Sequence, residues 1–411
     1  MTGQLWLIVS GIVLARLLGT TNRGYLALLV LLPLVLEQIG AAGLPFATAY
    51  FVARDPFQTR PIAHLAVRWW LRQSALMVLL QGGILMVYLV HRGSFLWPVA
   101  AMSLVIVPSM LAVDYGLALL QGLRRFLAFN VARNLIAATG CSASLAAVLL
   151  GLHDFAAIGA LLMASYVISG TVVALVSWSA VRRLPSTVAS TSLQEFRRFG
   201  WRAFIGSIYP FESFRFDQLI VGALFPASGL GLYVVAYAFT NLPRFVTQSL
   251  GMVAYPLIAS LGDRSSQKKT LLGFTLLASL LAVGAVAGLE IVMGWLVPVL
   301  FGQSFVGSVQ LARILLPGAL CFALRRILAE GLKGAGYPAI GTAAEVAAWV
   351  AMVPLAAALI RILGLQGVAL AADGAAFISL VTLLYLDWRG PRFAVGRGVP
   401  ELRDGPAATI S

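Results

Sequence analysis

Long runs of apolar residues recur along the whole chain and are separated by short segments that hold most of the charged residues. A transmembrane helix needs about 20 apolar residues to cross about 30 Å of hydrocarbon. Runs of this length predict twelve membrane-spanning helices, at residues 3–20, 24–53, 73–91, 95–120, 132–152, 155–181, 201–225, 229–261, 270–297, 306–330, 338–361 and 366–388. The predicted fold class is an all-α polytopic membrane protein.

Composition excludes the main alternatives to a membrane protein. Hydrophobic residues make up 60% of the 411 positions and charged residues only 11%, whereas soluble domains are about 25% charged. The two cysteines lie in apolar stretches and the three histidines have no ligand spacing between them. These numbers exclude a soluble domain, a disordered chain and a disulfide scaffold, and we expect no metal site and no catalytic residues.

The basic residues, which give a formal net charge of +14, are distributed among the loops in a way that predicts the orientation of the chain. With a cytoplasmic N-terminus, the inner loops and adjoining span ends hold most of the lysines and arginines, Arg325 among them, and the outer loops hold only Arg23, Arg92 and Arg361. Cations gather in the cytoplasmic loops of membrane proteins. We therefore predict a multi-pass protein of a bacterial inner membrane, with both termini in the cytoplasm and no nucleic-acid partner.

The chain carries a weak internal repeat of half its own length. Pro108 and Pro317 match at an offset of 209 residues, as do Gly122 and Gly331. Each half then contains six spans, and an even number of spans makes the two repeats parallel. At this offset, the position that corresponds to the start of the seventh span falls before Met1. We therefore expect a short first helix or a start codon further upstream.

The repeat predicts two six-helix lobes around a central cavity, which is a transporter architecture. The predicted division is an N-lobe at 1–183, a cytoplasmic amphipathic linker at 184–200, a C-lobe at 201–390 and a cytoplasmic tail at 391–411.

Charged side chains inside the predicted spans, Asp114 among them, are candidates for function. Each costs at least about 2.5–3.5 kcal/mol at a helix centre unless it faces a cavity or a partner. The strongest polar stripe lies on the eighth span, at Tyr237, Asn241, Arg244, Gln248 and Gly251. These positions share one helical face. The stripe either lines the cavity or pairs with groups inside the bundle.

Other intramembrane charges suggest distinct roles. Glu212 and Arg215 share a face of the seventh span, whereas Asp217 points away from Arg215. Of Arg215 and Asp217, one is expected to pack inside the bundle and the other to line the lumen. Glu37 lies near the middle of the second span, where a carboxylate can exchange a proton or bind Na⁺. We assign coupling or gating to Glu37 and Asp217, with structural pairing as the alternative. Arg16 is close enough to a helix end to reach the outer headgroups.

Two inner segments have the pattern of interfacial helices. Arg60, His64, Arg68 and Arg72 recur every four residues, with tryptophans between them, and the segment 195–202 is rich in Arg, Phe and Trp. Such segments lie in the membrane interface with their aromatic face among the headgroups. We predict that both act as lipid anchors.

Several short strings resemble motifs of bacterial polysaccharide flippases of the O-antigen type, in the multidrug/oligosaccharidyl-lipid/polysaccharide exporter (MOP) superfamily. The strings are ARLLG at 15–19 followed by RGY at 23–25, LLQGLRRF at 119–126, RFDQL at 215–219, GLGLY at 229–233 and GAGYP at 334–338. The first loop reads GTTNRG at 19–24 where the family pattern is GPEGRG, so an acidic position is missing. The extra helix pair of peptidoglycan-precursor flippases is also absent from the predicted spans.

The resemblance implies an alternating-access flippase for a polyprenyl-diphosphate-linked oligosaccharide, without a cofactor except H⁺ or Na⁺ as a coupling ion. Arginine can hold a diphosphate through bidentate hydrogen bonds. The residues expected to bind substrate are Arg16, Arg215, Asn241, Arg244 and Gln248. Membrane lipids are further expected partners, and a polysaccharide polymerase and glycosyltransferases are candidates.

Three other functions stay open at this point. A multidrug antiporter of the same architecture would select cations and is expected to have an acidic cavity, in contrast to the arginine stripe. A membrane glycosyltransferase or polymerase acting on the same lipid carrier would need outer carboxylates, and Asp154 is almost the only acidic residue there. A non-enzymatic scaffold of an envelope complex is the third.

Overall fold

The computed structural model describes residues 2–90, 94–184, 192–207, 214–261, 263–335 and 337–389. The described residues form helices and short connections, which confirms the predicted all-α class. The first half contains α1 (Thr2–Ala41), α2 (Leu44–Arg54), η1 (Pro56–Gln58), α3 (Thr59–Leu89), η2 (Ser94–Leu96), α4 (Trp97–Ser103), α5 (Ile106–Gly122), α6 (Phe126–Leu149) and α7 (Phe155–Val181). The second half follows a connecting helix, α8 (Leu193–Ser207), and contains α10 (Phe216–Leu224), α11 (Ala227–Phe239), α12 (Asn241–Ala259), α13 (Arg264–Phe301), η3 (Gln303–Phe305), α14 (Gly307–Gly334), α15 (Pro338–Leu363) and α16 (Leu365–Trp388).

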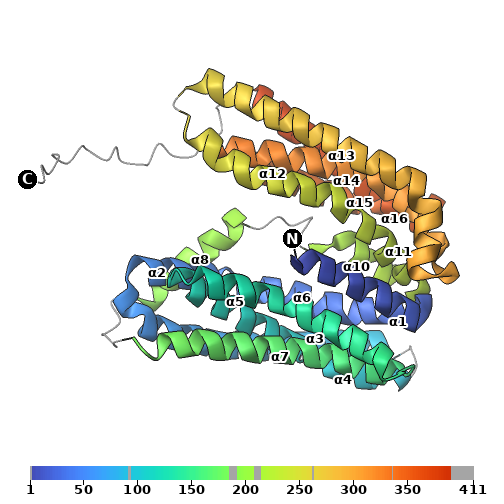
Figure 1. The fold of residues 1–411 in the computed structure, drawn as a ribbon, viewed down its shortest axis with the longest axis horizontal. Helices are drawn as coiled ribbons and strands as arrows, with labels where there is room; N and C mark the ends of the chain where they lie inside the picture. The colour runs from blue at the N-terminus through green and yellow to red at the C-terminus, as the bar shows by residue number, and fades with distance from the viewer. Residues whose placement is uncertain are drawn as a thin grey trace, which may run out of the picture.

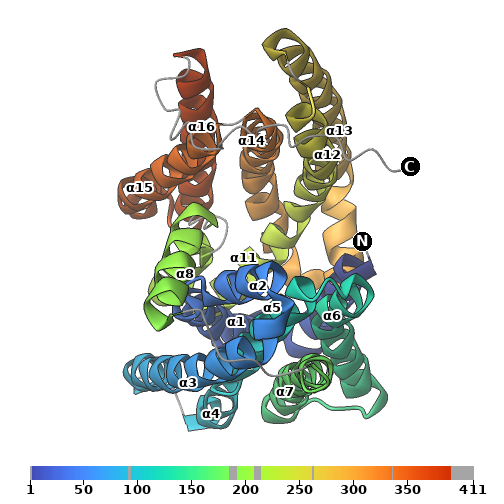
Figure 2. The ribbon, with the colours of Figure 1, turned by 90° about the vertical axis from the view of Figure 1, so that its left-hand side faces the viewer.

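The helices form two bundles that meet at one end of the molecule. In Figure 1, α2 to α7 occupy the lower half and α12 to α16 the upper half, with α1, α10 and α11 between them on the right. Figure 2 shows the same two bundles end-on, with α1, α2 and α5 facing the upper bundle. The predicted linker at 184–200 includes the start of α8, which packs on α2, and the predicted tail at 391–411 lies outside the described residues.

The first two predicted spans are the two arms of α1. The chain turns at Gly19, whose φ of 66° lies in the left-handed region that favours glycine. In Figure 1 the first arm runs from the N-terminus to the right-hand end, and the second arm returns to the left to reach α2. The predicted second span also breaks at its other end, where Gly43 (φ 70°) precedes α2.

Two other predicted spans are interrupted. The seventh is split between the end of α8 and α10, and the eighth is divided into α11 and α12 at Thr240. Because of these two interruptions, and because α1 contains two of the predicted spans, nine helices among the described residues are long and apolar enough to cross a membrane, compared with twelve predicted spans. Broken helices at membrane depth are tolerated where protein or a water-filled cavity surrounds the exposed backbone groups.

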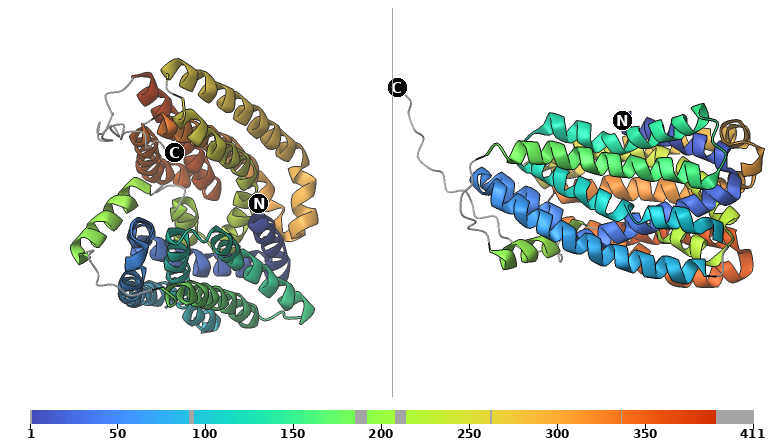
Figure 3. Two further views of the ribbon diagram at one scale, coloured as in Figure 1. Left: turned by 60° about the vertical axis from the view of Figure 1, so that its left-hand side comes forward. Right: turned by 90° about the horizontal axis from the view of Figure 1, so that it is seen from below.

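The helices run mostly along the long axis of the molecule (Figure 3), and many of their outer faces are apolar. On α13, for example, Leu280 is 72% exposed and Ile291 is 83% exposed. In water such a surface would be costly, but lipid chains solvate it. The helical bundles therefore have the surface of a membrane protein.

The two bundles are joined by a very close crossing of α1 and α11. An added Cβ at Gly24 would lie 1.7 Å from the carbonyl oxygen of Ala227, and one at Gly231 would lie 2.0 Å from that of Thr20. Small residues let helix backbones approach in membranes, where packing replaces the hydrophobic effect between helices. Tyr233 of α11 is fully buried beside this crossing, in the largest apolar cluster of the structure.

We expect Gly231→Ala to destabilise the protein, because its methyl group overlaps a backbone oxygen that cannot rotate away. Overpacking of this kind costs about 1–3 kcal/mol. Gly284→Ala is the matched control, because no atom lies within 4 Å of a Cβ added there. Thermal unfolding in detergent measures both variants. A Gly231→Ala protein that melts with or above the control would contradict the proposed role of the crossing.

Candidate functional site

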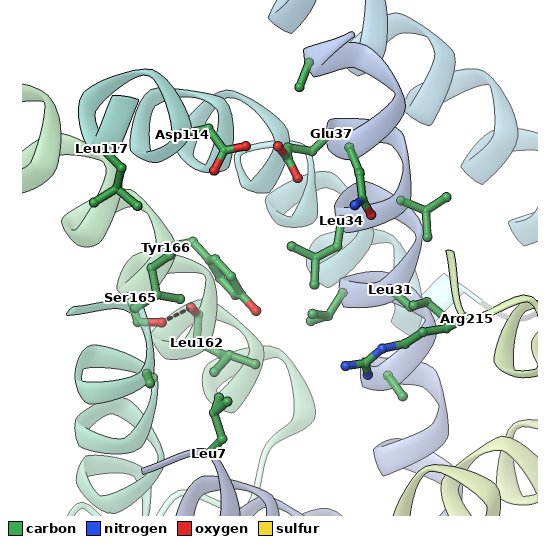
Figure 4. A pocket seen from close by; sticks show the side chains of 18 of the residues that line it. Leu7, Leu31, Leu34, Glu37, Asp114, Leu117, Leu162, Ser165, Tyr166 and Arg215 are labelled. Atoms are coloured by element: carbon green, nitrogen blue, oxygen red, sulfur yellow. Dashed lines mark hydrogen bonds between the residues drawn. The ribbon is translucent and has the colours of Figure 1, made fainter. Parts of the chain in front are cut away.

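A cavity of about 680 Å³ lies inside the first bundle and extends to the junction with the second. Its walls come from both arms of α1 and from α2, α5, α6 and α7, with single contributions from α8, α10 and α11 and from Arg215, which precedes α10. Figure 4 shows leucine side chains such as Leu31, Leu34 and Leu162 on these walls, with charged groups at separate positions. The cavity is therefore apolar over most of its surface and has a small number of polar contacts, as ligand cavities do.

Two arginines and a tyrosine form the basic part of the cavity. Arg23 belongs to the second arm of α1, Arg215 precedes α10, and Tyr166 belongs to α7. Tyr166 and Arg215 point toward each other across the cavity (Figure 4). The Nε atom of Arg23 is buried and has no hydrogen-bond partner among the described residues. Guanidinium donors directed into an apolar cavity suit a phosphate or carboxylate.

An acidic pair occupies a different part of the same cavity. Glu37 is on α1 and Asp114 is on α5, and their carboxyl groups point toward each other (Figure 4). Glu37 is only 7% exposed, and its Oε1 atom has no hydrogen-bond partner within the described structure. Two carboxylates this close in a buried site repel each other unless a proton or a cation lies between them.

The backbone places Arg215 and Asp217 on opposite sides of α10. Arg215 has a left-handed conformation (φ 45°) immediately before the helix and faces the cavity. Asp217 is buried instead and accepts a hydrogen bond of 3.0 Å from the Tyr233 hydroxyl. This arrangement is the one expected of residues two apart on a helix. Asp217 therefore does not line this cavity, and its contact ties α10 to α11.

Arg244 lies on α12 in a small aromatic and basic cluster next to the junction. Its Nη1 atom donates a 2.6 Å hydrogen bond to the Tyr237 hydroxyl, and its guanidinium lies 5.0 Å from the ring centroid of Phe322. Arg215 contacts the same tyrosine ring from the cavity side, at 5.6 Å. Tyr237 is thus in contact with two of the three arginines predicted to bind substrate.

The other predicted substrate-binding residues are spread over the structure. Gln248 lines a cleft of about 20 Å³ together with Arg244, Arg325 and Arg326, and Asn241 is half-buried at the start of α12. Neither is part of the large cavity. Glu212 lies outside the described residues.

Arg16 is placed at the junction of the two bundles and not in the cavity. Its guanidinium donates hydrogen bonds to the backbone carbonyls of Leu300, at 2.8 Å, and of Val299. These carbonyls belong to the last turn of α13, where a cation also meets the negative end of the helix dipole. Arg16 therefore connects the first arm of α1 to the second bundle.

Arg325, predicted as a cytoplasmic loop cation, is buried inside the second bundle. It forms an ion pair with Glu345 of α15, and the two side chains are 1% and 0% exposed. The loop assignment is wrong because α14 continues from Gly307 to Gly334, so that this arginine lies within the helix. Arg313 and Glu290, by contrast, form a 3.5 Å pair on the surface.

Sequence reasoning missed two of the four charged groups that line the large cavity. Arg23 was assigned to an outer loop, and that assignment is wrong because α1 resumes immediately after the turn at Gly19. Asp114 was recognised as an intramembrane charge but was given no role. The available signal for Arg23 was its position in the string that resembles a flippase motif, at 23–25.

We expect Glu345→Gln to destabilise the second bundle, because it leaves the Arg325 charge buried without its partner. Breaking a buried pair typically costs about 3–5 kcal/mol. Glu290→Gln, in the exposed pair, should cost about 0–1 kcal/mol. The double replacement Arg325→Met with Glu345→Leu should recover much of the loss. Thermal unfolding in detergent compares the variants, and equal losses at Glu345 and Glu290 would contradict the assignment.

With this geometry established, comparison with solved structures defines the class of the fold. The lipid II flippase MurJ in its inward closed conformation superposes with a TM-score of 0.78 and 11% sequence identity, covering 94% of this chain and 86% of that one. A multidrug resistance MATE family transporter of the MOP superfamily in its inward-facing conformation gives 0.73 at 17% identity, covering 94% of both chains. The outward-facing form of such a transporter gives 0.57 at 14% identity, covering 94% of this chain and 91% of that one. The chain has the fold shared by MurJ and MATE transporters.

The profile of the polysaccharide biosynthesis protein family matches residues 13–310. The chain belongs to this family. A search of curated protein sequences finds no significant match.

Proposed function

We propose that this protein is an alternating-access flippase, which moves a polyprenyl-diphosphate-linked oligosaccharide from the inner to the outer leaflet for surface polysaccharide synthesis. The family and the MurJ-like fold support a flippase or exporter. The observation that carries the substrate class is the basic part of the cavity, where Arg23 and Arg215 face an apolar space. A diphosphate cannot cross hydrocarbon unaided, and two guanidinium groups can replace its hydration through charge-assisted hydrogen bonds.

The shape of the junction supports alternating access. The bundles are joined at the α1–α11 crossing, and the structure is more similar to an inward-facing transporter (TM-score 0.73) than to an outward-facing one (0.57). Rocking of one bundle against the other about this junction would open the cavity to the opposite side. The positive-inside pattern supports an inner-membrane location with both termini in the cytoplasm.

The rival function with a specific observation in its favour is a multidrug cation antiporter of the same fold. Glu37 and Asp114 could attract an organic cation into the cavity. The two arginines in the same cavity would repel it, however, and we therefore favour the anionic substrate. A glycosyltransferase or polymerase is a weaker alternative, because the solved structures that share this fold are a flippase and transporters.

We further propose that the Glu37–Asp114 pair couples transport to H⁺ or Na⁺. The pair can hold a proton or a small cation between its carboxyl groups and release it when the cavity changes its access. It is separate from the basic part of the cavity, so ion and diphosphate can bind together. A polymerase or glycosyltransferases acting on the same carrier are the proposed protein partners.

We expect Arg23→Ala and Arg215→Ala each to lower transport roughly tenfold or more, because a hydrogen bond to a charged group contributes about 1.5–3 kcal/mol. Arg215→Lys should recover only part of the rate, since an ammonium lacks the planar fork. Flipping of a fluorescent polyprenyl-diphosphate-linked glycan in proteoliposomes measures the rate. Arg182→Ala, at the exposed end of α7, is the matched control. Wild-type transport by both cavity variants would exclude this substrate mode.

We expect Glu37→Gln to abolish the response of transport to an imposed H⁺ or Na⁺ gradient, because one ionisable group of the pair is lost. Glu195→Gln, on the exposed face of α8, should leave the response unchanged. The measurement is initial transport rate in proteoliposomes with and without each gradient. A Glu37→Gln protein driven as strongly as wild type would show that the pair does not couple.

A further inference from the structure

A groove separate from the cavity described above lies between α2, α3 and the connecting helix α8. Its volume is about 830 Å³, and its lining shares no residue with the cavity. Apolar and basic side chains both contribute: Leu44, Trp69, Leu193, Arg197, Arg198 and Trp201 are the main ones. The proposed transport mechanism uses none of them.

The groove is a fixed feature because α8 is seated tightly on α2. A Cβ at Gly43 would lie 2.1 Å from the carbonyl oxygen of Gly200, so the two backbones touch. Phe196 is fully buried against α2, and the ring of Phe199 stacks on Tyr50 with centroids 4.2 Å apart. The position of the α8 arginines relative to α3 is therefore set by packing.

Two guanidinium groups from different helices share one tryptophan. Arg72 of α3 lies 5.6 Å from the ring centroid of Trp69, and Arg197 of α8 lies 5.7 Å from the same centroid. Neither arginine forms an ion pair with any residue in the described ranges. Cation–π contacts stabilise each one. Of the two, Arg197 lines the groove, together with the neighbouring Arg198. An anion in the groove would offset the repulsion between the Arg197 and Arg198 charges.

The residues around these arginines have the composition of a membrane interface. Trp201 is 56% exposed and lies on the groove wall, and tryptophan is enriched where headgroups meet hydrocarbon. Leu44 and Leu193 provide apolar surface next to the arginines. A ligand that fits must therefore be anionic at one end and apolar at the other.

We propose that this groove binds an anionic phospholipid, with its phosphate at Arg197 and Arg198 and an acyl chain along Leu44 and Leu193. The lipid bridges α3 and α8 and so ties the connection between the two bundles to the first bundle. The site is independent of the transport substrate, because its lining is separate from the cavity.

Native mass spectrometry of the purified full chain tests the proposal, with phosphatidylglycerol and phosphatidylcholine titrated separately. We expect one phosphatidylglycerol to bind tightly and phosphatidylcholine to bind weakly. The double variant Arg197→Gln with Arg198→Gln should weaken phosphatidylglycerol binding roughly tenfold or more, as expected for loss of charge-assisted contacts. Arg182→Gln with Arg183→Gln removes the same charge from an exposed arginine pair after α7 and should leave binding unchanged.

Equal weakening by the two double variants, or equal binding of the two lipids, would overturn the proposal. Inorganic phosphate is added in a further arm, and complete displacement of the lipid by millimolar phosphate would assign the site to a free anion instead. Should the Arg197/Arg198 variant not fold, quenching of Trp69 by brominated phosphatidylglycerol in detergent, taken as the difference from Trp69→Phe, gives a second readout. Absence of Trp69-dependent quenching would also overturn the proposal, whereas loss of transport has no bearing on either measurement.

Discussion

The structure depends on the backbone contact between α1 and α11. Because Gly24 and Gly231 have no side chains, two helices from different halves of the chain meet at a distance that any Cβ would prevent. This crossing brings the second arm of α1 beside both bundles, and the same arm supplies much of the cavity wall. A close junction at one end and separate bundles elsewhere give the molecule a natural axis for rocking.

The charges inside the bundles serve three different physical purposes. Arg23 and Arg215 face the cavity and are available to a ligand. Arg16 instead satisfies backbone carbonyls at the end of α13, and Arg325 neutralises a buried glutamate. A cation in an apolar segment therefore does not by itself identify a binding site, because helix ends and buried carboxylates also stabilise cations.

The resemblance to both MurJ and MATE transporters shows that one architecture carries cargoes of very different chemistry. The polarity of the cavity must then decide the cargo. In the function proposed here, the arginines of the cavity hold an anionic headgroup, and the separate Glu37–Asp114 pair holds a small cation. The amphipathic helix α8 adds a third chemistry, a basic and aromatic groove at the interface, which lies outside the transport route.

The sequence by itself determined the all-α membrane class, the approximate spans and the presence of Glu37 and Arg215 at membrane depth. Apolar run length and charge distribution are local properties, so they can be read without tertiary structure. Only the tertiary structure decided where the side chains point. Because the chain turns at Gly19, Arg23 lies in the cavity and not in the predicted loop. The packing of α5 on α1 places Asp114 beside Glu37. Hydropathy gives the depth of a residue in the membrane, whereas its partner is set by contacts between helices that are distant in sequence.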